Sequence, residues 1–325
     1  MKAIVITELG GPEVMKYMEV AMPSVKENEV LIRVEKTSVN FADVKSRYGK
    51  KGAAKLPFIP GIDAAGVVVE VGANVTSFQV GQRVLAFPSN GSYAEYIVAN
   101  EKLTFALPDE LDFTTAAACP IVSFLSYSLL ANVAKIEKGE TVLIHAASGG
   151  VGTTAIQLAK LLGANTVIGA VGSEQKRGIA LEAGADHVIS YEKEGFAEEI
   201  MTLTDNKGVD IILDSVSGTI AEKSFTSLAP YGRFVQFGNS GGHAAIFKSS
   251  GLHASCRSVL GFSLGTTRKL RPHLLQETAK HVFSYLVNGD LHIKVGQHFP
   301  LEEATKAHEW MESRQSTGKI ILDVR

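Results

Sequence analysis

The sequence predicts an α/β protein with two domains, an antiparallel, partly barrel-like β domain and a doubly wound parallel sheet. Short β-type runs separated by turn clusters fill the first hundred residues, whereas strand and helix patterns alternate from about residue 140. The 325-residue chain also exceeds the length at which a single hydrophobic core stops growing. We therefore expect the β domain at residues 1–122 and 268–325, and the parallel-sheet domain at residues 123–267.

Turn-rich segments separate the strands that the first domain is expected to contain. These strands lie at residues 3–7, 29–37, 65–71, 83–86 and 93–98. The stretch 113–134 that follows carries no charged residue and is long enough to cross a bilayer. Because Pro120, Asn132 and several Ser and Thr residues interrupt it, we expect two buried helix segments instead.

Alternating strands and helices follow, which is the signature of a doubly wound parallel sheet. The expected strands are 141–145, 166–171, 187–190, 209–214, 232–238 and 258–262. Helices are expected at residues 273–288 and 301–313, with a short strand between them. The final strand, 319–324, comes too late to continue this sheet, so we expect it to return to the first domain.

Composition argues against several classes of partner. Hydrophobic residues make up 45% of the chain, charged residues make up 20%, and the formal net charge is −2. Without a basic excess, neither a nucleic acid nor a membrane surface is an expected partner. The N-terminus lacks the long apolar region of a signal peptide, and Cys119 and Cys256 do not form a C-x-x-C pair. Reduced thiols in a cytoplasmic protein fit this pattern better than disulfides.

The most informative segment is 141–165, which has the pattern of a strand, a glycine turn and a helix. Ala146 stands at the first position of the usual G-x-G-x-x-G pattern, giving A-x-x-G-x-x-G. A pyrophosphate must approach the N–H groups of a helix N-terminus closely, and a Cβ in the turn would hold it off. The segment therefore predicts a dinucleotide site. Its candidate contacts are Ser148, Gly149, Gly150, Val151 and Gly152.

The end of the next strand favours NADPH over NADH. An NAD site places an acidic residue there to bind the ribose 2′-hydroxyl, but this chain has Gly172. Ser173 can bind a phosphate, and Lys176 and Arg177 supply positive charge. Glu174 argues mildly for NADH, and the alternative is that both cations only form a solvated helix face.

Five ordered motifs carry a resemblance to a known family. They are VNFADV around Asn40, PGIDAAGVVVEVG at 60–72, GSYAEY at 91–96, HAASGGVG at 145–152 and FGNSGG at 237–242. Over its whole length the chain resembles the zinc-independent quinone oxidoreductases, the zeta-crystallin-like branch of the medium-chain dehydrogenase/reductase superfamily. The resemblance implies a GroES-like β-barrel domain, a Rossmann domain that binds NADPH, and a homodimer formed through the edge strand near residues 258–262.

The resemblance also implies that no metal takes part. Zinc-using relatives have Cys and His ligands at positions that correspond here to Asn40, Ile62 and Ile121. Cys119 lies close to one ligand position but lacks partners at ligand spacing, whereas a zinc site needs three or four donors. Without a Lewis acid, we expect hydride transfer to an electron-poor acceptor such as a quinone or an enone.

Three residues are candidates for the catalytic site by resemblance. Asn40 is expected to face the nicotinamide and bind the acceptor oxygen, the alternative being a helix or turn cap. Asp43 is expected to hold the loop by local hydrogen bonds. Several relatives carry a tyrosine where this chain has Lys51, and Tyr48 is the nearby substitute.

Further cofactor contacts are carried over from the family to strand ends, where ligands of parallel sheets bind. They are Lys45, Tyr191, Ser217, Gly218, Phe237, Gly238, Asn239, Ser240, Phe262, Ser263 and Leu264. For Tyr191 the alternative is a surface aromatic residue. His145 is interpreted as a core histidine with its hydrogen bonds satisfied.

Three functions follow. The first is NADPH-dependent reduction of a quinone. The second is reduction of an activated carbon–carbon double bond in an enone or enoyl compound, which the Lys51 departure disfavours. The third is a crystallin-like protein that binds NADPH with little activity. Fold alone does not decide among them, because function depends on the site.

Overall fold

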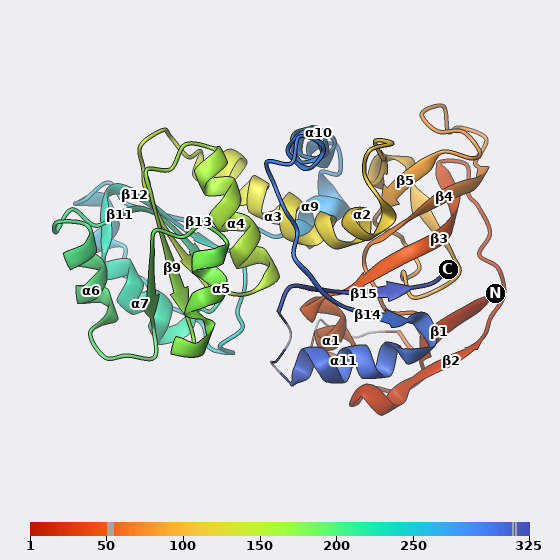
Figure 1. The fold of residues 1–325 in the computed structure, drawn as a ribbon, viewed down its shortest axis with the longest axis horizontal. Coiled ribbons are helices and arrows are strands. Elements are labelled where there is room, and N and C mark those ends of the chain that lie inside the picture. The colour runs from red at the N-terminus through yellow and green to blue at the C-terminus, as the bar shows by residue number, and fades with distance from the viewer. Residues whose placement is uncertain (51–54, 314, 316) are drawn as a thin grey trace. The chain divides into compact units, whose positions relative to one another are not determined.

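The computed structural model describes residues 1–50, 55–313, 315 and 317–325 (Figure 1). The chain forms two compact units. Unit 1 comprises Met1–Ile121 and Thr267–Arg325, and unit 2 comprises Val122–Thr266. These bounds differ by one residue from the domain boundaries expected from the sequence.

Unit 1 is built on a mainly antiparallel sheet. Its order is β14 (Val295–Pro300), β15 (Lys319–Asp323), β3 (Glu29–Val39), β4 (Ala64–Val71), β5 (Arg83–Ala86) and β7 (Thr104–Ala106), with β6 (Tyr96–Asn100) also paired to β3. A separate ribbon pairs β1 (Lys2–Ile6) with β2 (Met15–Glu19). Because β15 pairs antiparallel with β3, the final strand does return to the first domain.

Alternation along β3 builds the core of unit 1. Val30, Ile32 and Val34 are fully buried on one face and pack in a cluster with apolar residues of β4, β5 and β6. Successive side chains of a strand point to opposite faces, so the period of two seen in the sequence places these residues together.

Unit 2 contains the predicted parallel sheet. Its order is β10 (His187–Ser190), β9 (Thr166–Val171), β8 (Thr141–His145), β11 (Val209–Asp214), β12 (Leu228–Gln236) and β13 (Ser258–Gly261). The chain proceeds from β8 to β9 and β10 on one side, and then from β11 to β13 on the other. The strand order therefore reverses between β8 and β11, which is where open parallel sheets bind their ligands.

Helices connect these strands (Figure 1). In unit 2 they are α4 (Gly150–Leu161), α5 (Arg177–Glu182), α6 (Phe196–Leu203), α7 (Gly218–Thr226) and α8 (Ser250–His253). In unit 1 they are α1 (Phe41–Arg47), α10 (Leu274–Val287) and α11 (Ala304–Glu312), and α9 (Leu264–Leu270) lies at the boundary. Short 3₁₀ turns lie at Pro12–Val14, Glu101–Leu103, Glu174–Lys176 and Leu301–Glu303.

The uncharged stretch differs from its prediction. It forms one continuous helix, Phe113–Ala134, in which α2 (Phe113–Cys119) and α3 (Leu125–Tyr127) alternate with π-helical turns at Pro120–Phe124 and Ser128–Ala134. The expectation of two segments is wrong because a π turn accommodates Pro120, which lacks an N–H group. Among the described residues this helix is long and apolar enough to cross a membrane, and 72% of its apolar window is buried.

Other differences are local. The predicted strand 93–98 is shifted to β6, since Tyr93 and Glu95 instead form hydrogen bonds with β1. Neither β2 nor β7 was predicted. Four of the five residues of β2 are exposed, so its sequence shows no apolar alternation, and β7 is only three residues long.

Candidate functional site

The glycine turn after β8 presents unpaired backbone donors. Ala146 has a left-handed conformation with φ of 50°, and the N–H of Ala147 donates to the carbonyl of Ala170 at the end of β9. The N–H groups of residues 150–152 begin α4, so the helix has no carbonyl oxygen one turn earlier to accept their hydrogen bonds, as at any helix N-terminus. With the helix dipole, these groups form a site for an anion such as a pyrophosphate.

Two of the glycines meet different physical demands. A Cβ on Gly152 would lie 2.4 Å from the Ala146 carbonyl oxygen and 2.6 Å from the Ala147 Cα, so the helix packs on the strand too closely for a side chain. A Cβ on Gly149 would meet only the Ala146 carbonyl oxygen, at 3.4 Å. The space next to Gly149 is therefore not filled by other protein atoms, as the binding of a ligand there requires.

The loops after β11 and β12 lie together at the same edge of the sheet. The N–H of Phe237 donates to the Asp214 carbonyl, and the N–H of Ser240 donates to the Ser215 carbonyl, both at 2.9 Å. A Cβ on Gly238 would lie 3.0 Å from Ser215, so a glycine permits this approach. The structure thus brings together six predicted contact residues: Ser217, Gly218, Phe237, Gly238, Asn239 and Ser240.

The end of β9 combines a close approach with positive charge. A Cβ on Gly172 would lie 3.0 Å from the Tyr191 hydroxyl. Glu174 forms ion pairs with Arg177 at 3.5 Å and with Lys193 at 2.9 Å. Among the residues that the structure describes, Lys176 has no ion-pair partner. Glu174 thus offsets the charge of Arg177, and Lys176 remains available to an anion near Ser173.

Tyr191 is not a surface aromatic residue. Its ring packs edge-on against that of His145, with 6.2 Å between centroids, and joins the apolar cluster of unit 2. Burial is the largest cause of the raised pKa of its hydroxyl. Further along, Phe262 and Ser263 follow β13, and the buried Leu264 begins α9, where the Ser263 hydroxyl accepts the Thr266 N–H.

In unit 1 the predicted catalytic residues lie on or beside α1. Asn40 is the N-cap residue of this helix, and Tyr48 is its C-cap residue. Asp43 is buried, and its carboxylate accepts the Asn40 N–H at 2.9 Å, as expected for a residue that holds the loop. The Lys45 ammonium lies 5.3 Å from the Phe41 ring centroid. Lys51 lies outside the described residues.

The Asn40 side chain is held between two buried charges that the sequence analysis did not identify. The Lys319 ammonium donates to Asn40 Oδ1 at 2.7 Å, and Asn40 Nδ2 donates to Asp63 Oδ1 at 3.2 Å and to Ser38 Oγ at 3.2 Å. Both amide hydrogens thus have acceptors inside unit 1. Asp63 stands in the PGIDAAG motif, but only the fold brings Lys319 to it, 256 positions later in the chain.

Burial sets the electrostatics of this cluster. Burial raises the pKa of the Asp63 carboxyl, and this rise is partly opposed by the Lys319 charge, by the hydrogen bonds from Ser38 and Asn40, and by the Arg268 charge. Burial likewise lowers the pKa of the Lys319 ammonium against the attraction of Asp63 and Asp43. Each charge therefore depends on the other, because an isolated ion in a protein interior is strongly destabilised.

A second buried chain of hydrogen bonds ends at Asp43. The Arg47 guanidinium donates to His308 Nδ1 at 2.8 Å, and His308 Nε2 lies 3.1 Å from the Tyr93 hydroxyl, which donates to Asp43 at 3.3 Å. Burial and the Arg47 charge lower the pKa of His308 to about 3. His308 is therefore neutral at physiological pH, with its proton on Nε2.

The donor set offers no metal centre. Within the described part of the chain, no group of three or more His, Cys, Asp and Glu residues could hold a metal ion. Cys119 is buried and its thiol donates to the Ala116 carbonyl, whereas Cys256 is exposed.

Comparisons with known proteins define the class first. Residues 26–109 match the alcohol dehydrogenase GroES-like domain, and residues 150–280 match the zinc-binding dehydrogenase domain. The chain is thus a two-domain protein of the medium-chain dehydrogenase/reductase superfamily, with a GroES-like domain and a Rossmann domain.

Closer relatives define the family. The chain is 37% identical to a quinone oxidoreductase of Pseudomonas aeruginosa over 99% of both chains, and 35% identical to a 2-haloacrylate reductase of a Burkholderia species over 98% of both. A solved structure of an Escherichia coli quinone oxidoreductase complexed with NADPH has a TM-score of 0.91 at 34% identity, covering 99% of this chain and 100% of that one. The chain belongs to the zinc-independent quinone oxidoreductase family, as its sequence motifs predicted.

Proposed function

We propose that this protein transfers a hydride from NADPH to a quinone without a metal ion. The observation that carries the proposal is the open, donor-rich turn around Gly149, which lies where the strand order reverses and is followed one strand later by Lys176. The NADPH-bound Escherichia coli structure and the quinone oxidoreductase relatives support it.

Unit 2 is the proposed NADPH-binding domain, and unit 1 is the proposed substrate domain. The α4 N-terminus would hold the pyrophosphate, and Ser173, Lys176 and Arg177 would hold the 2′-phosphate. The remaining predicted contacts at the ends of the other strands would complete the site. NADPH supplies the hydride, and the protein's own contribution is to position the acceptor and exclude water.

Burial separates the roles of the three catalytic candidates. Asn40 and Asp43 are 5% and 1% exposed and bond to each other and to buried neighbours, whereas Tyr48 is 39% exposed. The Arg47 guanidinium and the Lys50 ammonium lie 4.7 Å and 5.4 Å from the Tyr48 ring centroid. We infer that Tyr48 contacts the acceptor and supplies a proton. Asn40 and Asp43 instead hold the start of α1 in place through their buried hydrogen bonds.

The test of this function is a comparison of acceptors. Steady-state rates with NADPH should give a higher kcat/KM for quinones than for medium-chain enones or 2-haloacrylate. A preference for the carbon–carbon double bond would establish the second function, which the Burkholderia relative supports. NADPH binding by calorimetry without turnover of any acceptor would establish the binding protein, and no binding at all would refute the proposal.

Two further expectations belong to the proposal. Among the described strands, β13 is at the edge of the unit 2 sheet and pairs with β12 on one side only. Pairing of the open side with the same strand of a second copy would give a homodimer. Light scattering should then report twice the 34.7 kDa mass of one chain. We also propose that the protein is cytoplasmic, which fluorescence imaging of a tagged chain would test.

A further inference from the structure

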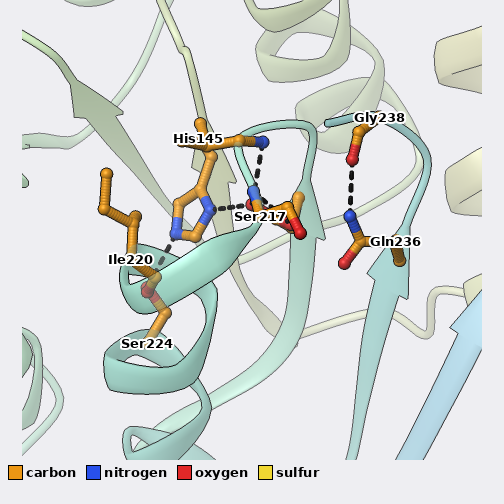
Figure 2. Close-up of polar contacts among 8 residues, drawn as sticks. His145, Ser217, Ile220, Ser224, Gln236 and Gly238 are labelled. Atoms are coloured by element: carbon orange, nitrogen blue, oxygen red, sulfur yellow. Dashed lines mark hydrogen bonds and ion pairs between the residues drawn. The ribbon is translucent and has the colours of Figure 1, made fainter. Parts of the chain in front are cut away.

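His145 is the centre of a fully buried relay of polar side chains in unit 2 (Figure 2). Its Nδ1 lies 2.6 Å from Asp214 Oδ1, and its Nε2 lies 2.8 Å from Ser224 Oγ. The three residues are at most 1% exposed. Ser224 is on α7, and its hydroxyl also donates to the Ile220 carbonyl one turn earlier, as Figure 2 shows. No water-exposed group takes part, so this set cannot act on a dissolved substrate.

The location of the relay is more informative than its chemistry. His145 is the last residue of β8, and Asp214 is the last residue of β11. These are the two neighbouring strands between which the strand order reverses. The bond from His145 to Asp214 therefore joins the strand ends beneath the point where such sheets bind their ligands.

Asp214 transmits this anchor to the loop above it. Its carboxylate accepts the Val216 N–H at 3.1 Å and the Ser217 N–H at 3.0 Å. Ser217 has φ of 70°, a left-handed conformation that a residue with a Cβ adopts only when its surroundings hold it there. A carboxylate that accepts two backbone donors is such a restraint.

The 215–217 loop also holds the loop that follows β12. The N–H groups of Ser240 and Gly241 donate to the Ser215 and Val216 carbonyls, both at 2.9 Å. The backbone orientation of residues 215–217 thus sets the position of the loop after β12. Two of the loops proposed to contact the cofactor depend on one carboxylate, and His145 orients that carboxylate.

We propose that His145 is a positioning residue for NADPH binding: through Nδ1 it fixes the Asp214 carboxylate, which holds the 215–217 loop in its cofactor-binding conformation. The inference rests on the proposed function, because it takes these loops to be the NADPH site. It assigns different roles to the two ring nitrogens. The Nδ1 bond serves cofactor binding, whereas the Nε2 bond to Ser224 only satisfies the other side of a buried ring.

Two amide substitutions separate these roles. In His145→Asn the side-chain amide takes the place of Nδ1 and keeps a donor for Asp214, whereas in His145→Gln it takes the place of Nε2 and reaches toward Ser224. We expect the Gln variant to bind NADPH about 10-fold more weakly, and the Asn variant to stay within about 3-fold of wild type. Thermal unfolding midpoints should fall equally in both, and kcat at saturating NADPH should change little while KM for NADPH rises in the Gln variant alone.

A second pair of variants tests the two ends of the relay without altering the ring. Asp214→Asn keeps the size of the side chain but removes a charged acceptor, and should weaken NADPH by about 10-fold. Ser224→Ala removes the opposite bond and should leave NADPH affinity within about 2-fold. Calorimetric titration of NADPH into the full chain measures all four variants.

The outcomes are distinguishable. Failure of the wild-type chain to bind NADPH refutes the proposed function, and this inference with it. Wild-type binding with equal losses in the Asn and Gln variants, or equal losses in Asp214→Asn and Ser224→Ala, refutes the positioning role alone, since His145 would then only fill the core. If the His145 variants do not fold, the Asp214 and Ser224 pair decides the question.

Discussion

The candidate sites of the two units are built from different parts of the polypeptide. In unit 2 the groups proposed to contact NADPH are mainly backbone N–H groups in loops and at the start of α4, and we propose that the buried His145–Asp214 pair supports them. In unit 1 the region around α1 is held by buried side chains, including the charges of Asp43, Arg47, Asp63 and Lys319. A site made of backbone requires glycines and turns, whereas a site made of buried charges requires every partner to be present.

This contrast predicts where substitutions act. Removing one buried charge in unit 1 leaves its partner unpaired in the interior, so the loss should appear in stability. Adding bulk at the open turn of unit 2 affects little of the protein itself, so the loss should appear in cofactor affinity. The four experiments below test this division, from the largest expected effect to the smallest.

The largest effect is expected for Lys319→Met. The substitution removes the stronger of the two cations that compensate the buried Asp63 carboxyl, Arg268 being the weaker, and it removes the donor to Asn40 Oδ1. The free energy of unfolding should therefore fall by about 3–5 kcal/mol in urea titrations. The double variant Lys319→Met with Asp63→Asn removes both charges and should recover part of this loss. If the single substitution leaves stability unchanged, the cluster is not a coupled ion pair.

The next largest effect is expected for Gly149→Val. The added side chain enters the space proposed for the pyrophosphate, so NADPH affinity should fall by at least roughly 100-fold in calorimetric titrations. The thermal unfolding midpoint should hardly change, since the new Cβ meets only the Ala146 carbonyl oxygen, at 3.4 Å. Gly251→Val is a matched control, because a Cβ there meets nothing within 4 Å. Unchanged affinity in Gly149→Val would place the pyrophosphate elsewhere.

The third experiment follows the pH dependence of unit 1. The pKa of His308 is about 3 in the folded protein, against 6.5 when unperturbed, so below pH 6.5 the unfolded chain takes up a proton that the native protein does not. His308 therefore supports stability above pH 6.5, and this support is lost as the pH falls towards 3, by up to about 1.4 kcal/mol per pH unit. Urea unfolding of His308→Gln across this range should show a flatter profile than wild type.

The control for this experiment is His253→Gln, at an exposed position. Its profile should follow that of the wild type. Identical slopes for wild type and His308→Gln would mean that the buried chain from Arg47 to Asp43 does not keep His308 neutral.

The smallest effect is expected for Lys176→Ala. Loss of one cation beside the 2′-phosphate should weaken NADPH by about 10-fold and NADH by less than about 2-fold. Arg177→Ala should have a weaker effect, because Glu174 already pairs with Arg177. Kd values for both coenzymes, measured by fluorescence titration, separate the two. Equal losses for NADPH and NADH would count against the phosphate contact.

The sequence was sufficient for the architecture of unit 2 and for its glycine turn. Strand, turn and helix lie within 25 consecutive residues there, and the chemistry of the turn depends on residues three positions apart. Apolar runs also located the parallel strands to within a few residues. Local patterns are visible in a sequence because the groups that act together are neighbours along the chain.

Elements with weak local patterns were missed or misplaced. Most residues of β2 are exposed, so its sequence lacks apolar alternation. The helix at 113–134 accommodates Pro120 through a π turn, which hydrophobic periodicity does not predict. In the sequence Tyr191 is an isolated aromatic residue, and only the structure shows that its ring packs against His145 and lies close to Gly172.

By itself, then, the sequence determined the fold class, the dinucleotide turn and the family, because these depend on hydrophobic periodicity and on short motifs. Only the tertiary structure decided which buried groups face each other. Lys319 with Asn40, His308 with Arg47 and His145 with Asp214 are separated by 279, 261 and 69 positions. Pairing over such separations is set by strand order and packing, which bring distant residues within hydrogen-bond distance and exclude the water that would weaken their interactions.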